Sequence, residues 1–318
     1  MTRIKKLAVL FLALVIVAGC AVLTRKLNPE DDGTGAEETI SVFSLNTEDV
    51  TKVSWTYADE TITLIDAGEG WMLEEDSQFP LDESYLNTML TTLSDIQATK
   101  TIESPEDLTQ YGLEEPTCSV TVTAESVSKI VIGDETGLGG QRYLSVGDGN
   151  VYLVDSSILD SFAYGLYDII QMETIPSMSD VRSFVTETEN GKLEIEYLEN
   201  SGLAYSDHYT WFAKDGDDDI TLDSELTYDL VDTITNLSWD SCVDYKATAS
   251  KLQEYGLADP AATVTVNYTE TIREDTGETD KEGNPVYENK EADRSFVLEL
   301  GNCENGYCYA RLAGSQMV

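Results

Sequence analysis

Histidine and serine motifs that carry out acid–base or nucleophilic chemistry are almost missing from this sequence. His208 is the only histidine among 318 residues, and it lies in a polar stretch, Tyr205–Tyr209, that is typical of a hairpin turn. The sequence contains no Gly-x-Ser-x-Gly motif. We therefore expect a surface histidine, no nucleophile–base pair, no metal site and no cofactor.

Acidic side chains are the abundant chemical group. The chain has 60 aspartates and glutamates against 19 lysines and arginines, a formal net charge of −41. In so acidic a chain some two carboxylates always lie at a separation that suits glycoside hydrolysis, so the sequence singles out no pair. The charge argues against a nucleic-acid partner, because such binding depends on neutralising phosphates with lysine and arginine.

Two local patterns have structural explanations. The acidic cluster Asp215–Asp219 lacks the sixth-position glycine and the terminal glutamate of an EF-hand calcium loop, and favours a solvated turn between strands. The glycine-rich stretch Gly137–Gly140 is followed by no Gly-Lys-Ser/Thr, so it predicts a hairpin loop and not a phosphate site.

Four of the five cysteines follow the N-terminal segment. Cys303 and Cys308 fit either a disulfide across a hairpin or two free thiols. Cys118 and Cys242 fall on apolar segments that we interpret as strands, where packing is the expected role. No Cys-x-x-Cys pair with a matching second pair occurs, so a structural zinc site is not expected.

The N-terminal segment, residues 1–27, has the order of an export signal. Basic residues precede an apolar run of 17 residues, Leu7–Leu23, and two further basic residues follow it. Within the run, Val17–Cys20 resembles the lipobox of bacterial lipoproteins, which makes Cys20 a candidate for lipidation. The alternative is an uncleaved anchor, for which the run is at the short end. Either way we expect a chain tethered to the bacterial cytoplasmic membrane, with its body outside the cytoplasm.

The rest of the chain repeats itself once. The segment Leu108–Pro116 returns 144 residues later as Leu252–Pro260, with Tyr-Gly-Leu-x-x-Pro in both, and an alternating Val-Thr-Val follows each. At the same offset one helical leucine series meets another: Leu86, Leu90 and Leu93 against Leu230, Ile234 and Leu237. We infer a tandem duplication, with repeats near 47–175 and 181–318, after a flexible acidic spacer over 28–46.

The repeated motif predicts a structural corner. Ser104 would cap a short helix, Gly112 would end it in the left-handed conformation, and Leu113 would fold back as its apolar contact. Pro116 would then lead the chain into a strand. In the second repeat Thr248 replaces the serine, and the motif consists of Tyr255, Gly256, Leu257 and Pro260. The alternative is a binding role for the two motif tyrosines, Tyr111 and Tyr255.

The hydropathy pattern around the corner predicts an α+β fold. Helices are expected over 82–94 and 156–164. Strands are expected over 51–57, 61–66, 70–74, 118–123, 128–132, 142–146 and 151–154. Each repeat should therefore be an antiparallel sheet with one or two packed helices.

The second repeat departs from the first in two places. It contains 24 additional residues, near 269–293, whose polar and turn-forming composition predicts an extended hairpin or a mobile surface loop. An alignment on Tyr143 and Tyr309 leaves it without a counterpart of residues 153–170. We expect either a sheet that closes without that helix or a shortened product.

Taken together these features resemble one bacterial family, the domain-of-unknown-function family DUF4340. The resemblance is carried in both repeats by a tryptophan strand, a Leu-Asp helix start, the corner, and a strand that ends in glycine: Trp71, Leu81, Asp82 and Gly133, with Trp211, Leu222, Asp223 and Gly301. Members of that family are typically anchored by an N-terminal apolar segment and often accompany ABC-type transporter permeases of the gliding-motility kind. The resemblance implies an accessory subunit outside the membrane and supplies no catalytic residue.

Three functions fit the sequence. The leading hypothesis is a non-enzymatic, membrane-tethered protein that contacts a transporter or another envelope partner. The second is a receptor for a carbohydrate, peptide or cation, with tyrosine-lined loops that contain Tyr143, Tyr152, Tyr164 and Tyr167. The third is an exported hydrolase, which needs a cleft with two carboxylates in unequal environments. The sequence leaves the oligomeric state open.

We predict that added salt raises the melting temperature of the folded part. Repulsion among the many carboxylates destabilises the compact state, and salt screens it, with a Debye length of about 10 Å at 0.1 M. Calorimetric melts at low and high ionic strength measure the effect. A melting temperature that stays constant with NaCl concentration would contradict the prediction.

Overall fold

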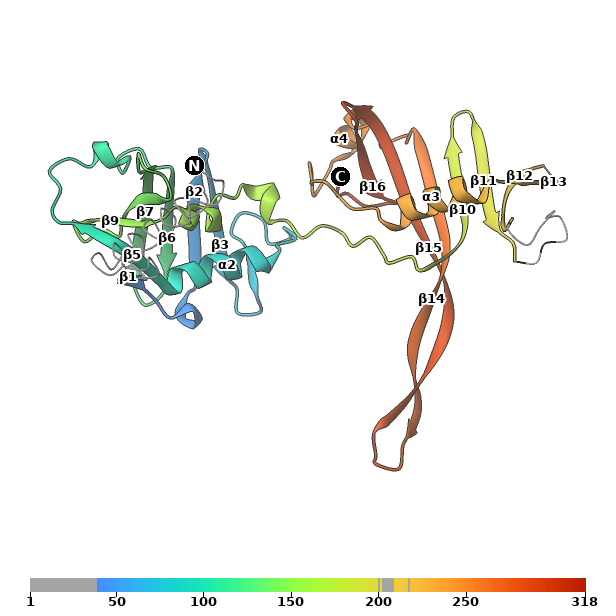
Figure 1. Cartoon of the computed structure of the whole chain (residues 1–318), viewed down its shortest axis with the longest axis horizontal. Helices are drawn as coiled ribbons and strands as arrows, with labels where there is room; N and C mark the ends of the chain where they lie inside the picture. The colour runs from blue at the N-terminus through green and yellow to red at the C-terminus, as the bar shows by residue number, and fades with distance from the viewer. Residues whose placement is uncertain (1–38, 200, 202–208, 217) are drawn as a thin grey trace, which may run out of the picture. The chain divides into compact units, whose positions relative to one another are not determined.

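The computed structural model describes residues 39–199, 201, 209–216 and 218–318. The predicted anchor over 1–27, Cys20 and His208 lie outside the described residues. The described chain forms two compact units. The first comprises the described residues up to Glu69 together with Ser84–Ala163, and the second comprises Gly70–Glu83 and Tyr164–Val318. Two antiparallel sheets with few helices confirm the predicted α+β class (Figure 1).

The first sheet has nine strands in the order β1-β5-β9-β8-β7-β6-β2-β3-β4. Its strands are β1 Ile40–Ser44, β2 Lys52–Tyr57, β3 Glu60–Asp66, β4 Trp71–Leu73, β5 Asp95–Ile102, β6 Cys118–Thr123, β7 Val127–Glu135, β8 Gln141–Ser145 and β9 Val151–Asp155. Its helical elements are the α-helix α2 Glu83–Ser94 and the 3-10 turns η1 Thr47–Asp49, η2 Thr109–Tyr111, η3 Ser156–Ser161 and η4 Leu166–Ile169. Two of these elements, β4 and η4, belong to segments grouped with the second unit.

Alternation along the strands builds the core of the first unit. In β6 the side chains of Cys118, Val120 and Val122 are buried, while the serine and threonines between them are partly exposed. In β2, Val53 and Trp55 are buried in the same way. The helix α2 buries three apolar side chains spaced three and four residues apart, Leu86, Met89 and Leu93, so one helix face belongs to the core.

The second sheet has seven strands in the order β13-β12-β11-β10-β14-β15-β16. The strands are β10 Asp180–Thr188, β11 Gly191–Tyr197, β12 Trp211–Asp215, β13 Asp218–Thr221, β14 Ala262–Thr279, β15 Pro285–Glu304 and β16 Tyr307–Leu312, and the helices are α3 Ser224–Thr235 and α4 Ala249–Glu254. Phe184 stacks on Trp211, with ring centroids 5.5 Å apart, in a core that also contains Val266, Phe296 and Leu298. The helix α3 is capped by the Asp223 carboxylate, which accepts hydrogen bonds from two N–H groups of the first turn.

The two sheets share one strand order. The series β8-β7-β6-β2-β3-β4 corresponds to β16-β15-β14-β10-β11-β12, as the repeat alignment requires. They differ at both edges, since β13 lies beyond β12 in the second sheet, whereas β4 is the outermost strand of the first. Beyond β8 the first sheet continues with β9, β5 and β1, whereas β16 is the outermost strand of the second sheet as far as the chain is described.

A long hairpin, formed by β14 and β15, marks the 24-residue difference between the repeats. As far as Thr269, β14 also pairs with β10, but from Glu270 outward β14 and β15 pair only with each other among the described strands. Figure 1 shows this part projecting beyond the strands of its own sheet. We call residues 270–292 the arm.

Four sequence predictions need correction. The flexible spacer expected over 28–46 includes the strand β1, Ile40–Ser44, which pairs with β5 in the first sheet. Ser104 caps no helix and has a φ of 45°. The short 3-10 turn η2 starts five residues further on, at Thr109, whose N–H donates a hydrogen bond to the Asp107 carboxylate. The helix expected over 156–164 is the 3-10 turn η3 only. Cys242 lies on no strand, because the segment equivalent to β5, residues 239–246, is irregular in the second unit.

Candidate functional site

The corner of the first repeat is a close contact between backbones. Gly112 ends η2 with a φ of 67°, and its N–H bonds the Thr109 carbonyl. It lies so near β7 that an added Cβ would be 2.4 Å from the Asp134 side chain. On the strand side, a Cβ on Gly133 would be 2.2 Å from the Tyr111 carbonyl oxygen. Only glycine fits at position 133, whatever its backbone angles, because any Cβ would overlap that oxygen.

The second repeat builds the same contact with other neighbours. Thr248 caps α4 as predicted, by accepting a hydrogen bond from the Lys251 N–H. A Cβ on Gly301 would again be 2.2 Å from a carbonyl oxygen, that of Tyr255. The Tyr255 carbonyl also accepts a hydrogen bond of 2.8 Å from the N–H of Asn302. The Tyr-Gly-Leu-x-x-Pro motif therefore holds the chain before β14 against the end of β15.

The remaining motif residues support these corners. Leu113 and Leu257 are buried, and Pro116 and Pro260 lie two residues before the starts of β6 and β14. The motif tyrosines each pack on a tyrosine of the neighbouring hairpin: Tyr111 on Tyr143 at 4.8 Å and Tyr255 on Tyr309 at 4.6 Å, measured between ring centroids. These contacts give the tyrosines a structural role in both repeats.

The four tyrosines considered for a receptor loop are divided between the two units. The Tyr143 ring is engaged with Tyr111, and Tyr152 is buried with its hydroxyl donating to the Asp148 carboxylate. This hydrogen bond, together with burial, raises the pKa of Tyr152. Tyr164 and Tyr167 belong to the second unit, where Tyr167 is exposed. In the first unit, therefore, the rings of both candidate tyrosines, Tyr143 and Tyr152, are engaged in packing.

The cysteines fall into two kinds. Cys303 and Cys308 are joined by a disulfide across the β15–β16 hairpin, where they are directly paired residues. Cys118 and Cys242 are free and buried. Burial raises the pKa of the Cys118 thiol to about 12 and also raises that of Cys242, so neither is an activated nucleophile.

Hydrogen bonds from neighbouring groups shift the pKa of several carboxyl groups. Every carboxyl group among them whose pKa departs from its ordinary value has that pKa lowered. At Asp107 the cause is hydrogen bonding from the hydroxyl and N–H of Thr109, and at Asp155 it is the same pair of donors on Ser157. A glycosidase acid needs a raised pKa.

Asp215, Asp218 and Asp219 of the acidic cluster lie in the β12–β13 hairpin, as the turn interpretation expected, and Asp217 lies outside the described residues. The Lys214 ammonium pairs with both Glu196 and Asp219, and these hydrogen bonds raise the lysine pKa. In the part of the chain that the structure describes, no group of three or more histidine, cysteine or acidic residues is arranged to hold a metal ion.

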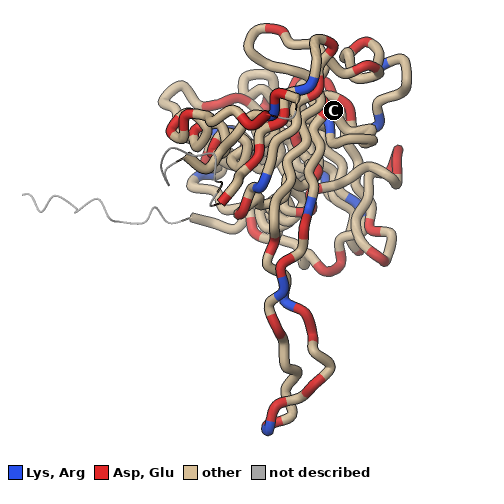
Figure 2. Tube along the Cα trace, turned by 90° about the vertical axis from the view of Figure 1, so that its right-hand side faces the viewer, with Lys and Arg blue, Asp and Glu red and all other residues tan. Residues whose placement is uncertain are grey.

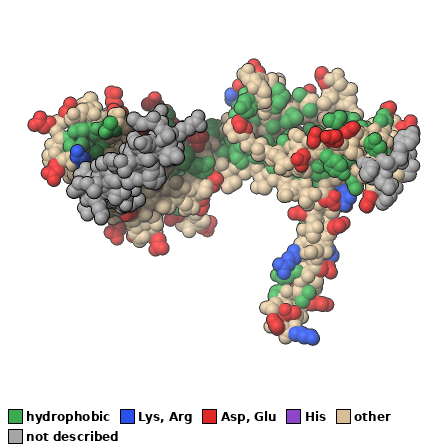
Figure 3. Space-filling model, viewed as in Figure 1, with side chains coloured by type: hydrophobic (Ala, Val, Ile, Leu, Met, Phe, Trp, Pro, Cys, Tyr) green, Lys and Arg blue, Asp and Glu red, His purple; other side chains and the backbone are tan. Residues whose placement is uncertain are grey.

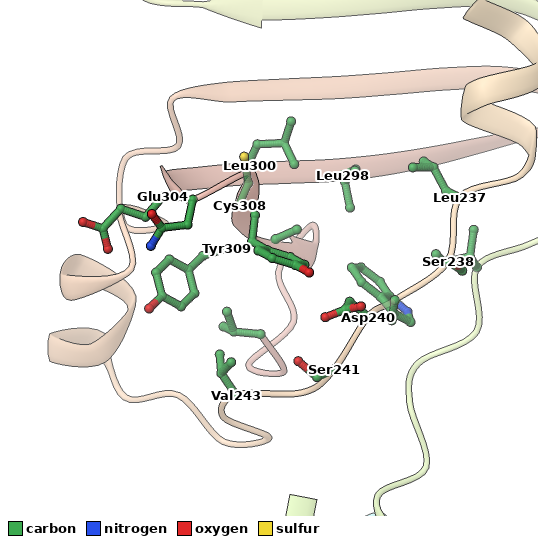
Figure 4. Close-up of a pocket in the computed structure, with 16 residues that line it drawn as sticks. Leu237, Ser238, Asp240, Ser241, Val243, Leu298, Leu300, Glu304, Cys308 and Tyr309 are labelled. Carbon is green, nitrogen blue, oxygen red and sulfur yellow. The ribbon is translucent and has the colours of Figure 1, made fainter. Parts of the chain in front are cut away.

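A cavity of about 530 Å³ opens at the free edge of the second sheet. We call it the edge groove; among the residues that line it are Leu237, Trp239, Val243, Leu300, Tyr309 and Ala310. Figure 4 shows Leu298 and Tyr309 on the strands, with Asp240, Ser241 and Val243 on the segment opposite. Exposed apolar residues on both sides of the groove include Val243 and Tyr307, which are 43% and 66% exposed.

Sequence reasoning missed the edge groove. The alignment of the repeats pairs β16 with β8 but does not indicate a cavity beside it. Hydropathy gave no separate sign, since the lining residues look like ordinary strand and loop residues.

The described chain is a duplicated α+β fold with a projecting hairpin arm and a groove beside β16. The model of the family described as Domain of unknown function (DUF4340) matches residues 71–219, just under half of the chain, and over these residues the chain is similar to that family. The match begins at β4 and ends in β13, so it spans most of the first repeat and the start of the second. No curated protein and no solved structure matches the chain. Among the described residues, no helix is long and apolar enough to cross a membrane.

We predict that the Gly133→Ala and Gly301→Ala variants are destabilised. Each new methyl group would overlap a backbone carbonyl oxygen, and overpacking of this kind costs about 1–3 kcal/mol or more. Calorimetric melting compared with the unsubstituted chain measures the loss. The control is Gly137→Ala, since a Cβ there meets no atom within 4 Å and the glycine has no positive φ. Equal melting temperatures for G133A, G301A and G137A would refute the corner contact.

We predict that the free thiols of the folded protein resist alkylation. Cys118 and Cys242 are buried, and their raised pKa values leave little thiolate at about pH 8, because the thiolate fraction falls as the pKa rises. Differential labelling with two isotopic forms of iodoacetamide, before and after denaturation, followed by mass spectrometry, measures this. Cys303 and Cys308 should react only after reduction. Rapid labelling of Cys118 in the native protein would contradict the assignment.

Proposed function

We propose that this protein is a non-enzymatic interaction subunit, tethered outside the cytoplasm by its N-terminal segment, that serves an envelope complex such as an ABC-type transporter. The apolar run Leu7–Leu23 and the basic residues on both sides of it support the tether. The observation that carries the interaction role is the arm, because a paired strand extension that leaves its own sheet contributes nothing to that sheet's core.

Within the arm, cross-strand contacts hold the hairpin in shape. The Arg294 guanidinium, at its base, donates to the Glu270 carboxylate at 3.0 Å, and Lys290 pairs with Glu274 further out. Arg273 lies over the Tyr287 ring, 4.0 Å from its centroid. Such cross-strand pairs contribute roughly 0.2–1 kcal/mol each, so the arm is stabilised although little of it is buried.

The surface of the arm suits contact with a protein partner. Figures 2 and 3 show acidic and basic side chains interspersed along it, with some hydrophobic side chains between them. Tyr287 is 43% exposed there. Exposed tyrosine and arginine are typical anchors of protein interfaces. The arm shares the acidic excess of the chain, with eight acidic and three basic residues over 270–292, so a partner that contacts it would be favoured by basic residues of its own.

We predict that shortening the arm abolishes partner binding but not folding. Residues 271–291 would be replaced by Asn-Gly, a two-residue hairpin turn that joins the paired residues Glu270 and Ala292. Tyr268, which is buried, and the pairing of β14 with β10 are retained. Mild cross-linking of the full-length chain in its native membrane, affinity purification and mass spectrometry should recover a transporter permease or ATPase with the intact chain and not with the shortened one.

The control for this experiment is Leu138→Asp, which changes a fully exposed apolar residue of the first unit. It should leave recovery of the partner unchanged. Equal recovery by the shortened chain would assign the contact to another surface. Recovery of no transporter component by the intact chain would reject the proposed function itself.

A further inference from the structure

We propose that the disulfide Cys303–Cys308 is a reversible exchange site, which a protein dithiol reduces while the second unit stays folded. The bond joins β15 to β16 at their hairpin, away from the arm. Its redox chemistry is additional to the proposed interaction role and does not depend on it.

The disulfide lies at an exposed hairpin tip. Cys303 and Cys308 are directly paired residues of the two strands, and every residue from Asn302 to Tyr309 is exposed. Exposed disulfides are among the labile and regulatory ones, because exchange requires a thiolate to reach a sulfur atom. Here the thiolate can do so without unfolding the unit.

The hairpin does not need this bond for closure. Asn305 and Gly306 form a two-residue turn with φ angles of 54° and 88°, and two positive φ angles are typical of the type I′ turns that favour hairpins. The two cysteines are only 5 positions apart in the sequence. A cross-link that closes so short a loop removes less entropy from the unfolded chain than one that closes a long loop.

The first unit closes the equivalent hairpin without a covalent bond. The alignment of the repeats places Glu135 and Arg142 at the positions of the two cysteines, and these residues are directly paired between β7 and β8. The loop between them, residues 136–141, is longer than the loop 304–307 of the second unit. A fold that closes the longer loop without a cross-link does not need one for the shorter loop.

The residues next to the disulfide both hold Tyr255, the tyrosine of the corner. Asn302, which precedes the first cysteine, donates its backbone N–H to the Tyr255 carbonyl at 2.8 Å. Tyr309, which follows the second cysteine, stacks on the Tyr255 ring with centroids 4.6 Å apart. The disulfide therefore restrains two contacts of one corner, and its reduction loosens this tip.

The exchange has two steps. A thiolate of the reductant attacks the Cys308 sulfur, the S–S bond breaks, and its electron pair leaves on Cys303, which takes up a proton. The Cys303 sulfur lies 3.8 Å from the Gly301 carbonyl oxygen, an acceptor for the thiol so formed. The second thiolate of the reductant then attacks the reductant's own sulfur in the mixed disulfide and releases Cys308, which is protonated. The reductant loses two electrons and two protons, and the two cysteines gain them.

Charge restricts the class of reductant. Glu304 follows Cys303 directly at the exposed tip, and the formal net charge of the chain is −41. Repulsion slows the approach of a negatively charged thiol such as glutathione. A protein dithiol with a neutral or basic surface around its cysteines is therefore favoured.

The test gives the full-length chain in detergent to thioredoxin, which thioredoxin reductase and NADPH keep reduced. The native chain should consume about one NADPH per molecule, since the couple transfers two electrons. A thioredoxin that lacks its second active-site cysteine should be trapped on Cys308, as identified by mass spectrometry. The melting temperature should fall by less than about 10 °C on reduction, because only a short loop is opened. Hydrogen exchange of the amides of residues 302–309 should become several-fold faster.

Two variants are the matched controls. The double variant C303E/C308R places the residue pair of the first unit at this hairpin, and C303S/C308S removes only the sulfur chemistry. Neither should consume NADPH above the level of the other thiols of the chain, and reductant should leave their hydrogen exchange unchanged. The chain with the shortened arm should be reduced like the intact one, which separates this result from that of the transporter experiment.

Reduction that requires denaturant would overturn the proposal, and so would reduction that unfolds the second unit. Equal NADPH consumption by C303S/C308S would also overturn it, because the reacting bond would then lie elsewhere. Trapping of thioredoxin on Cys303, or faster reduction by glutathione than by thioredoxin at equal thiol concentration, would contradict the assigned direction of attack and class of reductant.

Discussion

The contact between a tyrosine carbonyl and the glycine that ends a strand is the constraint on which each unit depends. The carbonyl of Tyr111 faces Gly133, and that of Tyr255 faces Gly301, at a distance that leaves no room for a Cβ. This contact fixes where the segment before β6 or β14 crosses the end of the neighbouring strand. Because β6 and β14 pair with strands on both sides, the corner also sets the position of an interior strand in each sheet.

The duplication keeps this constraint and changes what surrounds it. In the first unit the corner is a 3-10 turn, whereas in the second it is the α-helix α4 with its threonine cap. Both end at a glycine in the left-handed region, Gly112 or Gly256, and both place a tyrosine on the next hairpin. Parts of the chain away from this contact differ between the units, and the arm, formed by the far ends of β14 and β15, is the largest such difference.

The sequence predicted those parts of the fold whose signals are local. The Tyr-Gly-Leu-x-x-Pro spacing, alternation in β2 and β6, and the leucine series of α2 identified the corner, the strands and the helix correctly. The strand β5 was missed because Asp95–Ile102 has few apolar residues, and it is a strand through its pairing with β1 and β9, which lie far away in the sequence. The same dependence explains the error at Cys242: its segment resembles β5 in position but has no strand beside it in the described chain.

The open edge was beyond local prediction for a related reason, since an edge is defined by the neighbour that is missing. A cross-strand disulfide, Cys303–Cys308, ties β16 to β15 at the turn, and Arg311 ties it to Glu299 further along. Both fix β16 in an extended form beside β15, and both contacts join residues that only the pairing of these two strands brings together.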